Sequence, residues 1–119
     1  MNQSLFERLG GVEGITKIAS DLTDNHVANK ATAPRFSNSN IAMLKNAFAT
    51  FIISGTGGPN VYKGRDVWSA HKGMNISAVE FMAVLDNILA ALTKNNVGQR
   101  EQEEFLYILY SMRSQVVLV

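Results

Sequence analysis

A chain of 119 residues is long enough for one domain with its own hydrophobic core, which we place over residues 1–119. Eleven Lys and Arg against ten Asp and Glu give a net charge of +1, too balanced for the basic face of a nucleic-acid-binding protein. The absence of cysteine excludes disulfides, thiolate zinc sites and iron–sulfur clusters. No apolar run reaches about 18 residues and the N-terminus shows no secretory signal, so we expect a cytoplasmic protein without a membrane partner.

Capping residues and glycines divide the first half of the chain into helices. Ser4 and Glu7 have the spacing of a capping box, which predicts a short helix that ends at Gly10-Gly11. Apolar residues at helical spacing predict two longer helices, over 12–28 and 41–54. The pattern also predicts a connection without periodicity over 29–35 and a glycine- and proline-rich stop at 55–59.

The second half follows the same rules. Asp66 can cap a short helix that contains His71, and Ser77 with Glu80 forms a second capping box that opens a helix to about residue 94. After a turn over 95–98, a last helix is expected over 99–117. The apolar tail, Val116–Val119, must pack back or touch a neighbour, which suits a monomer or a weak dimer. No segment predicts a strand, so the fold class is all-α.

The chain has two histidines, and they differ in their surroundings. His26 has a polar neighbour and is expected to be a surface imidazole. His71 lies one turn from Val67 and Trp68, as a hydrogen-bonded core histidine would. A metal held only by side chains would need several carboxylates, and only Asp66 is near in sequence. A haem needs a single protein ligand, since the porphyrin supplies four nitrogens, so both readings of His71 stay open.

Other catalytic patterns are missing. The serines lack the G-x-S-x-G context of a hydrolase nucleophile, and the glycine-rich stretch at 55–58 follows a helix without the Gly-Lys-Ser/Thr ending of a phosphate loop. Paired carboxylates for acid–base chemistry cannot be identified. We therefore assign no catalytic residue.

Several residues form a distinctive pattern along the chain: Gly10-Gly11, Phe36, Gly57-Gly58-Pro59 with Tyr62 and Gly64, and His71 followed by Ile76 and Phe81. The pattern resembles the group I truncated haemoglobins from Ser4 to about Val117. The resemblance implies a two-over-two helical sandwich, in which helices 12–28 and 41–54 face helices 78–94 and 99–117. It also implies that His71 is the metal ligand, binding haem iron through one nitrogen and donating its other ring N–H to a backbone carbonyl or similar partner.

The resemblance assigns further roles position by position. It implies haem contacts from Phe36, Ser39, Leu44, Phe48, Phe51, Ile52, Tyr62, His71, Ile76, Phe81 and Val84. Among these, Ser39 and Tyr62 would hydrogen-bond the haem propionates. Lys63 and Arg65 would be charge partners for the same groups.

The chain departs from the family pattern at the gas-binding side. Thr23 stands where many members have tyrosine, Phe48 where glutamine is frequent, and Ala47 where some relatives carry an iron-binding His or Lys. With Leu44 at the gate, the ligand pocket of Thr23, Leu44 and Phe48 would be mostly apolar, with Thr23 its one candidate donor. A good donor contributes about 1.5–3 kcal/mol. Without one, O₂ should dissociate about ten to a hundred times faster from a pentacoordinate ferrous haem.

Three functions remain after this reading. The resemblance implies a haem protein that reversibly binds O₂, CO or NO. An enzyme that detoxifies NO is the alternative, with an unidentified reductase as its partner. A haem-free helical interaction module is the third, and the presence of both Phe36 and His71 argues against it.

Overall fold

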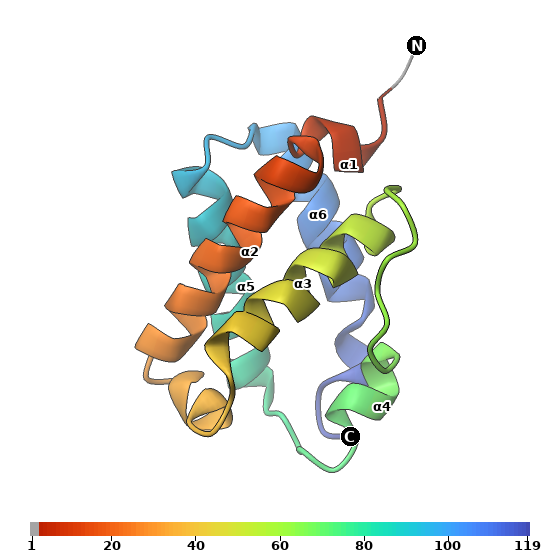
Figure 1. The fold of residues 1–119 in the computed structure, drawn as a ribbon. Coiled ribbons are helices and arrows are strands. Elements are labelled where there is room, and N and C mark those ends of the chain that lie inside the picture. The colour runs from red at the N-terminus through yellow and green to blue at the C-terminus, as the bar shows by residue number, and fades with distance from the viewer. Residues whose placement is uncertain (1–2) are drawn as a thin grey trace.

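Six α-helices and two 3-10 helices make up residues 3–119, the part of the chain that the computed structural model describes (Figure 1). They are α1 (Leu5–Arg8), α2 (Gly11–Ala28), η1 (Ala33–Phe36), α3 (Ile41–Gly55), α4 (Val67–His71), α5 (Ala78–Lys94), α6 (Gln99–Ser111) and η2 (Arg113–Gln115). The expectation of no N-terminal secretory signal concerns in part residues 1–2, which lie outside the described residues. Within the described residues, no helix combines the length and the apolar character needed to cross a membrane.

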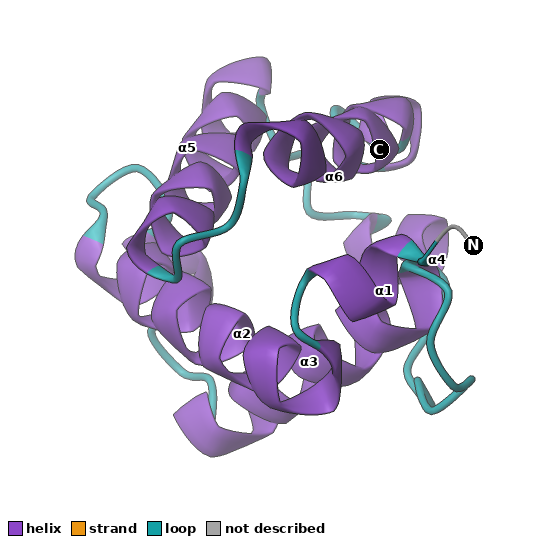
Figure 2. Cartoon of the chain, turned by 90° about the horizontal axis from the view of Figure 1, so that it is seen from above, coloured by secondary structure: helices purple, strands orange, loops and turns teal. Residues whose placement is uncertain are grey.

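The long helices form two layers. Helix α2 packs against α3 and α5, and α5 packs against α6, so that α2 and α3 lie on one side of the core and α5 and α6 on the other (Figure 2). The core between them is built from apolar residues at helical spacing, and Ile15, Ile18, Leu22, Ile52, Ile88, Leu92 and Phe105 are all buried. The predicted all-α, two-over-two sandwich is confirmed.

Local capping chemistry sets the helix starts. The Ser4 hydroxyl accepts from the Glu7 amide at 3.2 Å, and the Ser77 hydroxyl accepts from the Glu80 amide at 3.1 Å; both capping boxes are complete. The Asp66 carboxylate accepts from the backbone amide of Ser69, which opens α4. These three predicted helix starts are confirmed because each depends on residues only three apart.

The step from α1 to α2 needs glycine twice. Gly10 has φ +99°, a left-handed backbone conformation that residues other than glycine rarely adopt. A Cβ at Gly14 would lie 2.4 Å from the Leu9 carbonyl oxygen, so only glycine lets α2 begin this close to the end of α1.

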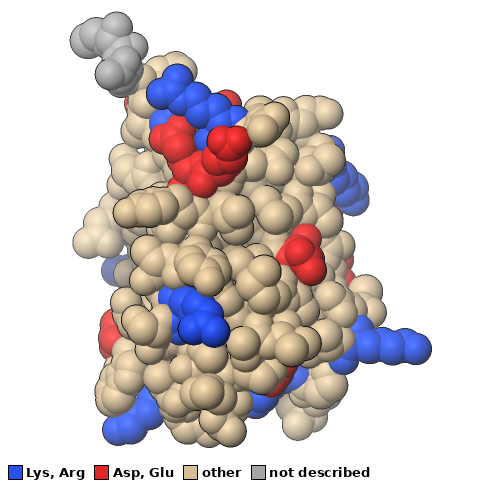
Figure 3. All heavy atoms as spheres, turned by 180° about the vertical axis from the view of Figure 1, so that it is seen from behind, with Lys and Arg blue, Asp and Glu red and all other residues tan. Residues whose placement is uncertain are grey.

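Charged residues lie on the surface in mixed groups: on the face in Figure 3, acidic and basic side chains are scattered or lie together, and neither sign gathers alone.

Two sequence-based boundaries were wrong. The last helix ends at Ser111, not near residue 117, and the tail turns back to form an isolated bridge between Ile76 and Val117. The Gly73 and Asn75 amides donate to the main-chain oxygen of Val119, and the Leu118 amide donates to the Ile76 carbonyl. The valines of the tail (116, 117 and 119) have lower helix propensity than Leu or Ala, which favours these main-chain bonds over helical structure in the tail. In addition, the connection expected at 29–35 contains η1.

The returning tail predicts a stabilising role for the last three residues. Deletion of residues 117–119 removes four backbone hydrogen bonds, at 2.8, 2.9, 3.0 and 3.2 Å, and should lower the free energy of unfolding by roughly 2–4 kcal/mol. Urea denaturation measures this loss. Leu118→Ala is the matched control, because that side chain is 68% exposed and its removal leaves every main-chain bond in place. An unchanged urea midpoint after the deletion would contradict the role of the tail.

Candidate functional site

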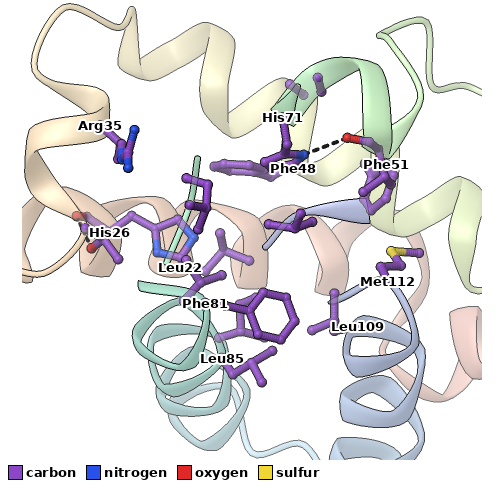
Figure 4. A pocket seen from close by; sticks show the side chains of 18 of the residues that line it. Leu22, His26, Arg35, Phe48, Phe51, His71, Phe81, Leu85, Leu109 and Met112 are labelled. Atoms are coloured by element: carbon purple, nitrogen blue, oxygen red, sulfur yellow. Dashed lines mark hydrogen bonds between the residues drawn. The ribbon is translucent and has the colours of Figure 1, made fainter. Parts of the chain in front are cut away.

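A cavity of about 350 Å³ lies between the two layers and is lined mostly by carbon atoms (Figure 4). Every long helix contributes to it, together with η1 and α4. Its apolar walls include Leu22, Leu44, Phe48, Phe51, Ile52, Ile76, Phe81, Val84, Leu85, Ile88, Leu109 and Met112. A volume in this range suits a small organic ligand or part of a larger one.

His71 is the last residue of α4 and lines this cavity. Its Nδ1 lies 2.7 Å from the Val67 carbonyl oxygen (Figure 4). A carbonyl can only accept, so Nδ1 carries a proton, and in the neutral ring Nε2 then keeps its lone pair. The hydrogen bond from the ring to a backbone carbonyl, expected from the resemblance, is present, and it leaves one imidazole nitrogen free to bind a metal.

The residues present fit a haem. No group of three or more His, Asp or Glu side chains in the described part of the chain could hold a metal ion by itself. A porphyrin-bound iron requires one imidazole beside an apolar cavity, because the porphyrin supplies the other four nitrogens, and His71 can provide that imidazole. The flat ring would meet aromatic and aliphatic side chains on the cavity walls.

Most of the positions taken from the resemblance line the cavity. Phe36, Leu44, Phe48, Phe51, Ile52, Tyr62, His71, Ile76, Phe81 and Val84 do so, and Ser39 does not, since it lies exposed between η1 and α3. The Tyr62 hydroxyl donates to the Arg65 carbonyl at 2.7 Å, so its proton is already used. Arg65 reaches the cavity, whereas Lys63 is exposed and does not line it.

Thr23 is fully buried but is not among the residues that line the cavity. Its hydroxyl donates to the Ala19 carbonyl, one turn earlier in α2, at 2.7 Å. That internal bond uses the only proton that a threonine side chain can donate.

His26 contradicts the expectation of a surface imidazole. It is only 3% exposed and lines the cavity. Its ring stacks on Phe36, with centroids 5.5 Å apart and planes 7° apart, and meets the edge of Phe48 at 5.7 Å. The polar neighbours of His26 in sequence misled the prediction, because Asn25 and Asn29 also point toward α5, where both donate to Asn87. Burial alone lowers the pKa of His26 to about 4, so the ring is neutral at pH 7.

A charged clamp that the sequence did not reveal joins three parts of the cavity wall. The Arg35 guanidinium binds the Glu80 carboxylate through two hydrogen bonds, of 2.7 and 2.9 Å, and donates a third to the Met74 carbonyl. Arg35, Glu80 and Met74 all line the cavity. The Arg35 guanidinium lowers the pKa of Glu80 to about 2. No local spacing could have predicted this pair, whose members lie 45 residues apart.

An all-helical sandwich of two helix pairs, with the free Nε2 of His71 at an apolar cavity, defines a globin-type domain. The comparisons agree: residues 4–117 match the family model of bacterial-like globins. The chain is 34% identical over 116 residues to a group 1 truncated hemoglobin of Tetrahymena pyriformis, covering 97% of this chain and 95% of that one. The crystal structure of the truncated hemoglobin from that organism in the Fe(III) form superposes with a TM-score of 0.94 at 26% identity, covering 98% of this chain and all of the other.

More distant relatives are also named truncated hemoglobins. A group 1 truncated hemoglobin of a Nostoc species is 22% identical over 114 residues, 96% of this chain and 97% of the relative. A group II truncated hemoglobin of Bacillus anthracis shares the fold, with a TM-score of 0.90 at 19% identity, covering 98% of this chain and 92% of that one. The chain belongs to the group 1 truncated haemoglobins of the bacterial-like globin family, as the resemblance had indicated.

Burial of His26 predicts a loss of stability in acid. Its pKa is about 4 in the folded protein and near 6.5 when exposed, so below pH 6.5 the unfolded chain binds a proton that the folded chain does not. The contribution of the neutral ring, about 3 kcal/mol, is complete above pH 6.5 and disappears as the pH falls to 4. Urea titrations at several pH values measure it. His26→Leu should flatten the dependence over this interval, and an equally steep fall in that variant would exclude His26 as its source.

The Arg35–Glu80 clamp predicts a second effect, with its own pH range. Glu80→Gln keeps the capping box, because glutamine also serves at that position, but removes the ion pair, so the free energy of unfolding at pH 7 should decrease slightly. The pKa of Glu80 is lowered, so the difference between wild type and variant should vanish as the pH falls from about 4.5 to 2. Glu103→Gln, an exposed change on α6, is the control. A difference that persists at pH 2 would show that the ion pair is not its cause.

Proposed function

We propose that this truncated haemoglobin holds haem through the Nε2 of His71 and reversibly binds a diatomic gas (O₂, CO or NO) in the cavity. The observation that carries the proposal is the free imidazole nitrogen of His71 at the wall of a mostly apolar cavity. Haem, when bound, supplies an iron whose remaining coordination position takes the gas. The relatives in the comparisons are themselves called haemoglobins.

In this proposal the His71 ring must be held in one orientation and must present a basic lone pair, and its bond to the backbone serves both needs. The hydrogen bond from Nδ1 to the Val67 carbonyl holds the ring plane and selects the tautomer with a lone pair on Nε2. A ring whose second nitrogen donates in this way is also a more basic ligand. The Gly73 and Asn75 amides, just after His71, donate to the Val119 oxygen, and these bonds limit movement of the His71 ring.

The apolar walls would supply most of the binding free energy. Each Å² of carbon surface removed from water contributes about 25 cal/mol, so a large flat ring between Phe36, Phe48 and Phe81 gains more than a surface ion pair could give. For the haem propionates we propose Arg65, which lines the cavity and has no carboxylate partner among the described residues. Arg35 is already paired with Glu80. Tyr62 would act through its bond to the Arg65 carbonyl.

Replacement of His71 tests the haem assignment. His71→Gly should abolish haem retention, and added imidazole should restore the absorption spectrum, because free imidazole can occupy the space left by the ring. Optical spectra of the ferric and ferrous forms, with and without imidazole, measure the effect. His26→Leu is the matched control, since it removes the other imidazole and should keep the haem. A His71→Gly protein with an unchanged spectrum, or a wild-type protein without Soret absorbance after haem addition, would contradict the proposal.

A further inference from the structure

A hydrogen-bonded relay of three side chains, Asn29, Asn87 and His26, fixes which nitrogen of the His26 ring carries the proton. It starts at the Ala31 amide, which can only donate, and which binds the Asn29 Oδ1 at 2.9 Å. The Asn29 amide group must therefore turn its Nδ2 outward, and it donates to the Asn87 Oδ1 at 3.0 Å. The orientation of both side-chain amides follows from one backbone N–H.

The same relay determines the tautomer of His26. With its oxygen occupied by Asn29, Asn87 turns its Nδ2 toward the His26 Nδ1 at 2.8 Å and toward the Thr32 hydroxyl at 3.2 Å. The Thr32 hydroxyl gives its own proton to the His26 carbonyl, so it accepts from Asn87. The His26 Nδ1 is thus an acceptor, and the proton of the neutral ring lies on Nε2.

The Nε2–H group opens onto the cavity. Every fully buried polar side-chain atom in the described residues has a hydrogen-bond partner, yet His26 Nε2 has none among them. It therefore keeps some accessible surface, and the cavity is what the ring lines. Figure 4 shows the ring of His26 on a different wall from His71, on α2 rather than α4.

We propose that His26 is the hydrogen-bond donor of the ligand site, presenting a neutral Nε2–H to a small anionic or polarised ligand. This inference rests on the proposed haem function. Thr23, the donor that the resemblance suggested, donates its hydroxyl proton to the Ala19 carbonyl and does not line the cavity. His26 supplies what Thr23 lacks: a proton with no partner inside the protein, on a ring held between Phe36 and Phe48.

The relay also argues against His26 as a second iron ligand. Iron would need the lone pair of Nε2, which requires the proton to move to Nδ1. Asn87 would then have to turn its oxygen to His26, and its bonds with Asn29 and Thr32 would be lost. An imidazole whose tautomer is fixed in this way is a donor, not a ligand, as long as Asn87 stays in place.

The tautomer itself can be measured by a readout that does not depend on ligand affinity. The chain has only two histidines, so ¹⁵N-histidine labelling of untagged protein gives two rings, and His26→Leu assigns them. In the CO-bound ferrous protein at pH 7, His26 should show a protonated Nε2 and an unprotonated Nδ1. A proton on Nδ1, or on both nitrogens, overturns the proposal. The measurement also works on protein that fails to bind haem, so failure of the haem assignment is recognised separately, by the missing Soret band.

Azide binding to the ferric protein tests the donor role. His26→Leu should weaken azide binding at least about tenfold, equivalent to about 1.4 kcal/mol. Asn87→Asp, whose carboxylate accepts a proton from Nδ1, should invert the tautomer and weaken azide binding as well; Asn46→Asp, an exposed change on α3, controls for the added charge. Thr23→Val tests the competing donor. Azide affinity within twofold of wild type in His26→Leu, a tenfold loss in Thr23→Val, or a low-spin wild-type spectrum that depends on His26 would each overturn the proposal.

Discussion

The site of this globin depends on one hydrogen bond, from the His71 ring to the Val67 carbonyl within α4. An imidazole in an apolar cavity can present either a proton or a lone pair, and the carbonyl leaves only the lone pair. The helix that holds the ring has five residues, too few to be stable by itself, so its position comes from its surroundings. The Asp66 cap, η2 and the returning tail supply them.

The two histidines show the same principle applied in opposite directions. At His71 a backbone acceptor fixes the proton on Nδ1, and at His26 a side-chain donor from Asn87 fixes it on Nε2. One ring thus offers a ligand atom to the cavity and the other offers a proton. The difference is maintained by neighbours that cannot exchange roles, a carbonyl in one case and an amide oriented by Asn29 in the other.

The polar and the apolar walls of the cavity come from different helices. The wall that α3 contributes is apolar, since Leu44, Ala47 and Phe48 all line the cavity. The proposed hydrogen-bond donor comes instead from α2, as the His26 ring, which Asn87 on α5 holds in place. The proposed donor therefore belongs to the interface between the two layers, where a change in helix packing would alter it.

Local chemistry could be predicted from the sequence because its partners are close along the chain. Both capping boxes, the glycine step at Gly10 and the helices that apolar spacing predicts over 12–28 and 41–54 were correct for that reason. By residues alone His71 could have been an ordinary core histidine, and only the resemblance pointed to haem. The burial of His26, its tautomer, the Arg35–Glu80 clamp and the return of the tail were decided by the tertiary structure. The tautomer, the clamp and the tail depend on groups between 41 and 61 residues apart, and the burial of His26 depends on contacts with Phe36 and Phe48 outside its own helix, which no local spacing relates.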